Sequence, residues 1–339
     1  MFGSLGDQYA ELWKAIIRPP RDVYDVRELG PSVFSVDHRA YQRSDMVLTN
    51  NRGMRLMCSH FEPVASERKA KRLPCCVYLH GNCSSRLEAI SILAVVLPLQ
   101  ISVFAFDFAG SGLSDGEYVS LGHYERDDLQ VVVEHLRNLG TVSSIALWGR
   151  SMGAVTALMH GDRDPSIAGM ILDSPFSSLE SLAQELVNVY VNVSIPTWMV
   201  SGALWMIKNS IKTKADFDID ELNPLEHVDK CFIPALFCSA YNDTFIKPAH
   251  TTRLYEKYAG DKNFLMIEGD HNSQRMKFFM DSAAIFLCAT LRCEPLTESN
   301  LSEMVTPDML HPDPTRLVPQ PFKTSRGRVH FLCFVILFL

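Results

Sequence analysis

The sequence predicts an α/β fold: a mostly parallel, doubly wound sheet with helices on both faces and a helical insertion above it. Short apolar segments of strand length alternate along the chain with longer segments in which apolar residues recur every three or four positions. Most of the short segments are predominantly apolar, as expected of parallel strands buried on both faces. The composition, with 47% hydrophobic and 21% charged residues, is that of a globular protein and excludes general disorder.

The predicted elements follow one another in a regular order. Strands are predicted at Met46–Thr49, Met54–His60, Cys75–Leu79, Ile101–Phe106, Ser144–Trp148, Gly169–Leu172, Ile233–Ser239 and Phe264–Ile267. Helices are predicted at Arg86–Leu97, at Leu121–Leu139, from Met152 onward, near His250–Tyr258 and in a final segment that ends at about Leu291. The first two strands flank residues 50–53, Asn-Asn-Arg-Gly, which tolerate the positive φ of a hairpin turn. Most later strands are separated by helices, which favours parallel pairing.

Residues 1–45 are predicted to be a leader that packs on the main domain, residues 46–293. Apolar residues recur at helical spacing in this leader, and Pro19-Pro20 ends the helix. The apolar positions are Leu5, Tyr9, Leu12, Trp13, Ile16 and Ile17. Docking on the domain core is the favoured role. Contact with a membrane surface is the alternative, although the polar side of the helix is not rich in Lys and Arg.

Two segments interrupt the alternation of strands and helices. Residues 174–230 have no strand pattern, and this length between two strands predicts a helical cap above the sheet. Four large side chains of the cap either line a pocket for an acyl chain or form the core of the cap itself: Trp198, Met199, Trp205 and Met206. Residues 294–339 are rich in proline and are predicted to be a flexible tail. Its apolar end, Phe331–Leu339, is too short to span a bilayer, which needs about 20 residues.

Charge and cysteine content limit the expected partners and compartment. The chain has 32 Lys and Arg residues against 39 Asp and Glu, a net charge of −7, so it lacks the surplus of cations that nucleic acid binding needs. The nine cysteines are scattered, and the first thirty residues lack the apolar run of a secretory signal. We expect a cytoplasmic protein. If it contacts a membrane peripherally, the N-terminal helix or the apolar C-terminus is expected to make the contact. No clustered Cys/His set and no His-Glu-x-x-His pair occurs, so neither a metal nor a cofactor is expected.

The strongest chemical signal is Gly149–Gly153, Gly-Arg-Ser-Met-Gly, between a predicted strand and a predicted helix. A serine hydroxyl is a weak nucleophile unless a sharp turn aims it at a base, and flanking glycines let the backbone make that turn. By composition alone such a string arises on the order of once in ten chains of this length. Its context therefore decides whether Ser151 is a nucleophile.

The ends of other predicted strands carry the groups that such a serine needs. Upstream, a strand ends just before Asn82, and the backbone N–H groups of Asn82 and Met152 are the candidate donors to a developing oxyanion. Downstream, one strand ends near Asp243 and the next near His271. The chain order Ser, Asp, His is that of one triad-bearing fold. The sequence thus predicts a site formed by Ser151, Asp243 and His271.

Three other carboxylates lie near strand ends. Asp270 adjoins His271 but is ranked below Asp243, because its backbone neighbourhood directs it elsewhere. Asp173, at the end of another strand, is the second candidate for the acid of the triad. Asp107 is expected to be structural, as a cap of the glycine-rich turn that follows it.

Across about residues 46–290 the chain resembles the α/β-hydrolases. Residues 107–114, Asp-Phe-Ala-Gly-Ser-Gly-Leu-Ser, resemble the family's Asp-x-x-Gly-x-Gly-x-Ser loop, and residues 172–176, Leu-Asp-Ser-Pro-Phe, resemble the turn after its sixth strand. With the leader sequence Ile17–Arg21, Ile-Arg-Pro-Pro-Arg, the chain is most similar to a plant and protist group of serine hydrolases. These are described as serine-aminopeptidase-like and are relatives of depalmitoylating hydrolases. The turn has Arg150 where the wider family often has His or Gln, which is expected to place a cation beside the nucleophile.

The resemblance implies a role for each member of the predicted triad. Ser151 is the nucleophile, His271 the general base and later the acid, and Asp243 the group that holds the imidazole tautomer. The implied reaction is hydrolysis of an ester, thioester or amide through an acyl-serine intermediate, with a carboxylesterase or acyl-thioesterase favoured.

Two alternative functions remain open at the level of sequence. An aminopeptidase needs acidic groups near the pocket to bind a free amine, and the insertion supplies Glu180, Glu185, Asp216, Asp218, Asp220 and Glu221. A non-catalytic binding module with the hydrolase fold is the second alternative, because a fold does not dictate a function.

Overall fold

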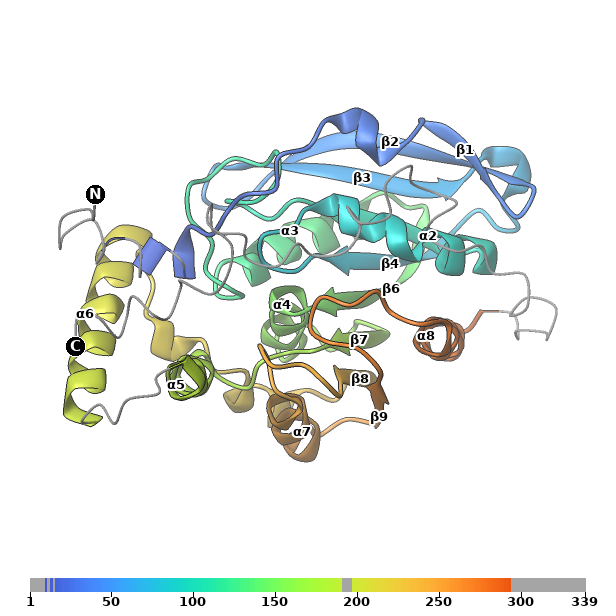
Figure 1. Ribbon diagram of the computed structural model, residues 1–339. Helices are drawn as coiled ribbons and strands as arrows, with labels where there is room; N and C mark the ends of the chain where they lie inside the picture. Colours follow the sequence, from blue (N-terminus) through green and yellow to red (C-terminus); the bar gives the residue numbers. More distant parts are fainter. Residues whose placement is uncertain (1–9, 11–12, 15, 191–196, 294–339) are drawn as a thin grey trace.

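A single sheet of nine strands organises the chain, and the computed structural model describes residues 10, 13–14, 16–190 and 197–293 of it (Figure 1). In space the strands run in the order β1-β2-β3-β5-β4-β6-β7-β8-β9. Their bounds are β1 Val33–Val36, β2 Arg39–Thr49, β3 Arg55–Pro63, β4 Leu73–Leu79, β5 Ser102–Phe106, β6 Val142–Arg150, β7 Gly169–Asp173, β8 Ala235–Ala240 and β9 Lys262–Ile267. The pairs β1–β2, β2–β3 and β3–β5 are antiparallel, whereas every pair from β5 through β4 to β9 is parallel. The predicted mostly parallel α/β sheet is confirmed.

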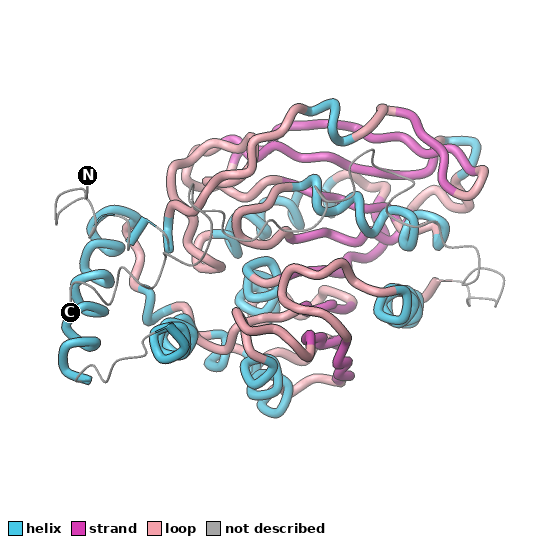
Figure 2. The backbone as a smooth tube through the Cα atoms, in the orientation of Figure 1, coloured by secondary structure: helices cyan, strands magenta, loops and turns pink. Residues whose placement is uncertain are grey.

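Helices cover both faces of this sheet (Figure 2). The α-helices are α2 Ile90–Val96, α3 Glu125–Asn138, α4 Met152–Gly161, α5 Leu179–Tyr190, α6 Thr197–Ala215, α7 Pro248–Lys257 and α8 Lys277–Leu291. Short 3-10 helices are η1 Val26–Leu29, η2 Ala65–Glu67, η3 Arg86–Ala89, η4 Leu97–Leu99, η5 Ile219–Glu221, η6 Pro224–Glu226 and η7 Val228–Lys230. One core cluster joins the sheet to α3, α4 and α7, and a second joins its other face to α2 and α8.

The two cores explain why the central strands have continuous apolar sequences. In β6, Leu147 belongs to the first core and Trp148 to the second, because successive side chains of a strand point to opposite faces. Both side chains are almost completely buried. A strand enclosed in this way has no solvent-facing positions and shows no polar alternation.

The sheet begins earlier than the predicted domain boundary at residue 46. β1 and most of β2 lie within the predicted leader and form an antiparallel hairpin, with Val36 paired to Arg39. Asp37 and His38 turn the chain with φ of 49° and 58°. A two-residue turn with both φ values positive usually contains glycine. Because this turn contains none, and because the hairpin lies at the sheet edge with many exposed positions, the sequence pattern does not reveal it.

The remaining described part of the leader packs against the domain. Trp13 and Ile17 are buried in the first core, and the Val119 amide donates a hydrogen bond to the Ile17 carbonyl at 2.7 Å. Leu5, Tyr9 and Leu12 lie outside the described residues, as does the predicted tail, residues 294–339. Within the described residues, none of the helices has both the length and the apolar character that crossing a membrane requires.

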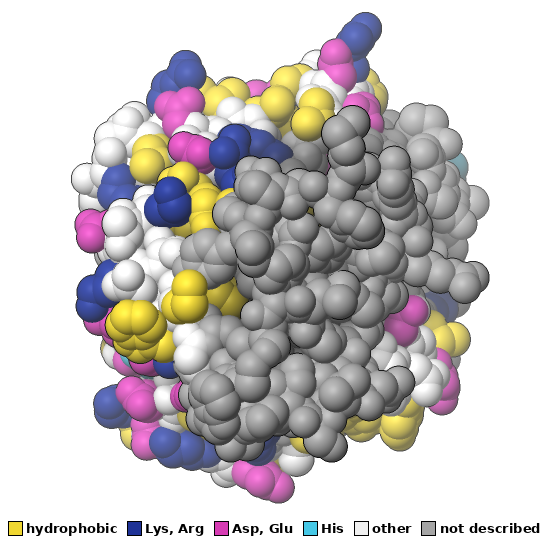
Figure 3. All heavy atoms as spheres, turned by 60° about the vertical axis from the view of Figure 1, so that its left-hand side comes forward, with side chains coloured by type: hydrophobic (Ala, Val, Ile, Leu, Met, Phe, Trp, Pro, Cys, Tyr) yellow, Lys and Arg dark blue, Asp and Glu magenta, His cyan; other side chains and the backbone are white. Residues whose placement is uncertain are grey.

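Helices α5 and α6 lie between β7 and β8, within the segment predicted to be a cap, and stand beside the sheet at the left of Figure 1. Trp205 and Met206 are 67% and 49% exposed, so these two residues do not form the core of the cap, which was one of the two predicted roles. Figure 3 brings this side of the molecule forward and shows hydrophobic side chains at the surface among charged ones. The side chains of Trp198 and Met199 lie outside the description.

Candidate active site

The carboxyl ends of the parallel strands meet at one edge of the sheet, and the candidate site lies there. Parallel strands point the same way, so the segments that follow β4, β6, β7, β8 and β9 are brought to a common edge. Asn82 follows β4, Ser151 follows β6, Asp243 follows β8 and His271 follows β9. Residues up to 189 positions apart in the chain, from Asn82 to His271, are thus gathered by topology.

Ser151 occupies a sharp turn between β6 and α4. Its φ of 52° and ψ of −116° are unfavourable for a residue with a side chain. The flanking glycines make the turn possible. A Cβ on Gly149 would lie 2.3 Å from the Gly153 carbonyl oxygen, and one on Gly153 would lie 2.0 Å from the Leu79 carbonyl oxygen. Only residues without a Cβ fit here, and the turn presents the Ser151 hydroxyl at the sheet edge.

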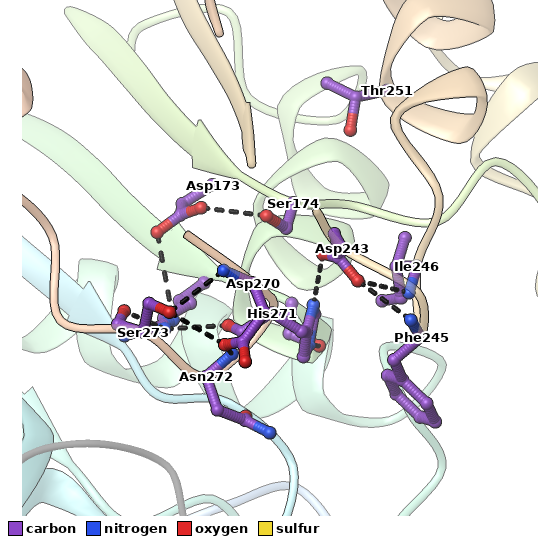
Figure 4. Close-up of polar contacts among 12 residues, drawn as sticks. Asp173, Ser174, Asp243, Phe245, Ile246, Thr251, Asp270, His271, Asn272 and Ser273 are labelled. Atoms are coloured by element: carbon purple, nitrogen blue, oxygen red, sulfur yellow. Dashed lines mark hydrogen bonds and ion pairs between the residues drawn. The ribbon is translucent and has the colours of Figure 1, made fainter. Parts of the chain in front are cut away.

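Ser151, His271 and Asp243 form one hydrogen-bonded chain. His271 Nε2 lies 3.1 Å from Ser151 Oγ, and His271 Nδ1 lies 2.7 Å from Asp243 Oδ2. The other carboxylate oxygen of Asp243 accepts the backbone N–H groups of Phe245 and Ile246 at 3.0 Å and 2.7 Å (Figure 4). A carboxylate only accepts hydrogen bonds, so Nδ1 carries the proton and leaves Nε2 free to accept from the serine hydroxyl.

The candidate oxyanion donors lie on two segments next to Ser151. Met152 is the first residue of α4, and neither its amide nor that of Asn82 donates to another described residue. The preceding residue, Gly81, approaches Ser151 so closely that a Cβ there would lie 3.9 Å from the Ser151 Cβ. The amides of Asn82 and Met152 therefore remain the candidate donors, on the two segments that adjoin the serine.

The segment that carries Asn82 is held by buried side chains. The Gly81 amide donates to Glu88 Oε2 at 2.9 Å, and the Gly81 carbonyl oxygen lies 2.8 Å from His80 Nδ1. His80 Nε2 accepts the Phe108 amide at 3.1 Å. These contacts fix His80 as the neutral Nδ1–H tautomer and hold the backbone before Asn82.

The other carboxylates near the site have different partners. Asp173, the second candidate acid, does not contact His271; its oxygens accept Arg275 Nε and Nη2 at 2.7 Å and 2.9 Å. Burial alone would raise the pKa of Asp173, but the guanidinium groups of Arg275 and Arg150 hold that pKa below its usual value. The role of Asp173 as the acid of a triad is therefore excluded by its geometry.

Asp270 and Asp107 serve the backbone around the site. Asp270 accepts Ser273 Oγ at 2.8 Å and the Asn272 amide at 2.9 Å, and the Ser273 hydroxyl bond keeps the pKa of Asp270 low. Asp107 accepts the Leu113 amide at 2.8 Å, within the glycine-rich turn that follows it. Both carboxylates stabilise loop conformations.

The Arg150 guanidinium, expected from the sequence to lie beside the nucleophile, binds the backbone of the segment that carries His271. The Arg150 side chain is only 7% exposed, and its Nη2 donates to the carbonyl oxygens of His271 and Ser273 at 2.8 Å and 3.1 Å. Arg275 and Glu88 also contact the site, although no sequence pattern predicts them. The only local signal for Arg275 is its position four residues after His271, and nothing near Glu88 in the sequence indicates its contact with Gly81.

Comparisons with known proteins agree with this architecture. Residues 71–223 match the family model for serine aminopeptidase, S33. The protein YqkD of Bacillus subtilis (strain 168) is 33% identical over 200 residues, which cover 58% of this chain and 64% of YqkD. The monoglyceride lipase of Rattus norvegicus is 28% identical over 194 residues, 52% of this chain and 59% of the lipase. The chain thus spans less than two thirds of the length of these relatives.

A solved structure provides an independent comparison of the fold. The Pyrococcus furiosus esterase Pf2001 superposes with a TM-score of 0.60 at 20% sequence identity, covering 81% of this chain and 98% of the esterase. At this identity the likeness concerns the fold alone. Taken with the nine-stranded sheet, it shows that the chain has the α/β-hydrolase fold.

Proposed function

We propose that the chain is a serine hydrolase that cleaves an ester or thioester bond through an acyl-Ser151 intermediate. The observation that carries the proposal is the hydrogen-bonded chain from Ser151 Oγ through His271 to Asp243, with distances of 3.1 Å and 2.7 Å. A nucleophile, a base and a group that orients the base lie within contact range, which is the arrangement that acyl transfer requires. The family model and the esterase fold support a hydrolase.

In the first half of the proposed reaction, Ser151 Oγ attacks the substrate carbonyl carbon and His271 Nε2 takes the hydroxyl proton. The Asn82 and Met152 amides stabilise the oxyanion of the tetrahedral intermediate. The intermediate collapses, the bond to the leaving group breaks, and His271 gives its proton to the departing oxygen or sulfur. Asp243 stays ionised and stabilises the transient imidazolium.

In the second half, water replaces the leaving group. His271 takes a proton from the water as its oxygen attacks the acyl carbon, and a second tetrahedral intermediate forms on the same two amides. This intermediate releases Ser151 Oγ, which regains a proton from His271. The products are a carboxylic acid and an alcohol or thiol, and the side chains return to their starting protonation states.

The acidic residues that would favour an aminopeptidase are largely engaged with cations. Glu185 lies near Lys247, His250 and Arg253. Asp218 and Asp220 pair with Lys212 and Lys208. Carboxylates already paired in this way are poorly suited to bind the free amine of a peptide, which supports the ester or thioester assignment over the aminopeptidase alternative.

The test is hydrolysis of medium-chain p-nitrophenyl esters and acyl thioesters, together with labelling by a fluorophosphonate probe. We expect activity and labelling in the wild type and loss of both in Ser151→Ala. Ser239→Ala is the matched control, because Ser239 is a buried serine on β8 whose hydroxyl has no hydrogen-bond partner among the described residues. Full activity in Ser151→Ala, or absence of labelling in the wild type, would refute the proposal and favour a binding module.

Cleavage of amino-acid anilides distinguishes an aminopeptidase from an esterase or thioesterase. We expect acyl esters or thioesters to be cleaved faster than amino-acid anilides by the same preparation. The reverse order, lost in Ser151→Ala, would replace the ester or thioester assignment with an aminopeptidase.

A further inference from the structure

Two loops carry the groups that act on either side of Ser151 in the proposed reaction. The oxyanion loop, residues 80–84, carries the Asn82 amide, and the histidine loop, residues 268–275, carries the proposed base. They follow different strands, β4 and β9, which lie on opposite sides of β6 in the sheet. Since Ser151 itself follows β6, the relative position of these loops decides whether both groups reach one substrate carbonyl.

The side chain of Arg150 bonds directly to the histidine loop. Its Nη2 donates to the carbonyl oxygen of His271, at 2.8 Å, and to that of Ser273, at 3.1 Å. These acceptors belong to the residue that bears the imidazole and to a near neighbour. Arg150 thus restrains the backbone from which the His271 ring projects, and it does so from the turn that holds the nucleophile.

The same guanidinium faces the support of the oxyanion loop. Arg150 Nη1 lies 3.8 Å from Glu88 Oε1, and the other oxygen of Glu88 accepts the Gly81 amide at 2.9 Å. Both side chains are at most 7% exposed, so solvent screens their attraction little. Glu88 Oε1 has no hydrogen-bond partner among the described residues, so the nearby Arg150 guanidinium contributes to compensating this buried charge.

Arg150 and Glu88 belong to a buried cluster of four charged side chains, with Asp173 and Arg275. Arg150 Nε lies 3.8 Å from Asp173, which Arg275 binds through two hydrogen bonds. Arg275 also donates to the carbonyl oxygen of Asp270, at 3.0 Å. Two buried guanidinium groups therefore face two buried carboxylates, and each charge has an opposite neighbour.

We propose that Arg150 is a positioning residue that joins the oxyanion loop to the histidine loop across Ser151. This inference rests on the proposed function, because positioning matters only if both loops serve one reaction. Arg150 is the residue before the nucleophile. It contacts the histidine loop directly, and it contacts the oxyanion loop through Glu88. Loss of the link displaces one loop relative to the other without removing any reacting group.

The kinetic test compares Arg150→Met, Arg150→Lys and Glu88→Gln with the wild type on a p-nitrophenyl ester. We expect kcat to fall by about 10²-fold in Arg150→Met, the scale of a misplacement near 1 Å, with KM changed less than about twofold. Arg150→Lys keeps the charge but not the forked donors, so it should recover part of kcat. Arg163→Met is the control, since Arg163 forms an exposed pair with Asp127. A kcat of Arg150→Met equal to that of the control would overturn the proposal.

A double-mutant cycle tests the link between the loops. Because Arg150 and Glu88 compensate each other, we expect the double variant Arg150→Met/Glu88→Gln to lose no more kcat than the worse single variant. Losses in kcat that simply multiply would mean that the residues act separately, which would overturn the link.

A spectroscopic readout separates failure of this inference from failure of the proposed function. The His271 Nδ1–H proton, bonded to Asp243, should give a downfield NMR resonance in the wild type whether or not the ester is a substrate. We expect Arg150→Lys, whose charge keeps the cluster balanced, to shift or broaden it while Arg163→Met leaves it unchanged. An unchanged resonance in both variants would overturn the inference, whereas absence of Ser151-dependent hydrolysis in the wild type would overturn the proposed function alone. If Arg150→Met does not fold, Arg150→Lys and Glu88→Gln serve the kinetic comparison.

Discussion

Arg275 binds Asp173 through two parallel hydrogen bonds, at 2.7 Å and 2.9 Å, between side chains that are 3% and 2% exposed. This pair connects the end of β7 to the histidine loop, since Arg275 also donates to the Asp270 carbonyl oxygen. A bidentate Arg–carboxylate contact is directional, so it fixes the orientation of the loop as well as its distance from the sheet.

Removing one partner of the Arg275–Asp173 pair should destabilise the protein strongly. We expect Arg275→Leu to lower the free energy of unfolding by about 3–5 kcal/mol, because it leaves the Asp173 charge buried with only the more distant Arg150 opposite it. Urea denaturation followed by circular dichroism measures this. Arg55→Leu, which breaks an exposed pair with Asp115, should cost only about 0–1 kcal/mol. Equal losses in the two variants would contradict the argument.

Replacing Asp243 should impair the proposed reaction without removing a reacting atom. In Asp243→Asn the amide can donate to His271 Nδ1, which favours the Nε2–H tautomer and prevents Nε2 from accepting the Ser151 proton. We expect kcat for ester hydrolysis to fall by about 10⁴-fold. Asp270→Asn is the matched control, because an asparagine oxygen can still accept the Asn272 amide. A comparable fall in that control would mean that Asp243 has no special role.

The glycines of the nucleophile turn should not tolerate a methyl group. In Gly153→Ala the new Cβ would meet the Leu79 carbonyl oxygen at 2.0 Å, so β4 or α4 must move. We expect a loss of at least 1–3 kcal/mol of stability, the usual range for overpacking, and a large loss of activity. Gly202→Ala, in α6 with no atom within 4 Å of the added Cβ, should instead be neutral or stabilising by about 1 kcal/mol. Thermal unfolding of both variants provides the measurement.

Buried Asp128 should give the stability a distinct pH dependence. Burial raises its pKa to about 6 from a model-compound value of 3.8, despite hydrogen bonds from the Ala109 amide and Asn50 Nδ2. Between these values the folded state binds more protons at this site than the unfolded state, so its contribution to stability is greatest below pH 4 and falls as the pH rises to about 6. Carboxylates with lowered pKa, such as Asp173, have the opposite effect and lose their contribution as the pH falls.

The comparison with Asp128→Asn isolates this effect. We expect the difference in unfolding free energy between wild type and variant to shift by roughly 2 kcal/mol in favour of the variant between pH 4 and pH 6, which is most of the effect that the pKa difference allows. Urea unfolding at several pH values measures it. A difference that does not change with pH would show that Asp128 titrates as it does in the unfolded chain.

Local sequence patterns predicted the parts of the fold that depend on near neighbours. The buried strands from β4 to β8 appear as apolar runs because both of their faces are covered, and the turn at Ser151 appears because only glycine fits at positions 149 and 153. The β1–β2 hairpin was missed because Asp37 and His38 adopt positive φ without glycine. The exposure of Trp205 was also missed, since helical spacing alone cannot say which side of a helix meets the core.

The sequence by itself determined the fold class, the turn at Ser151 and the order in which Ser151, Asp243 and His271 follow their strands, because each of these depends on residue types within a short span. Only the tertiary structure decided that Asp173 pairs with Arg275 rather than with His271, and that the Arg150 guanidinium binds the backbone of the histidine loop. These choices depend on which distant charges become neighbours once water is excluded. A buried ion takes the nearest opposite charge or carbonyl group that the packed chain provides, and sequence spacing does not encode that distance.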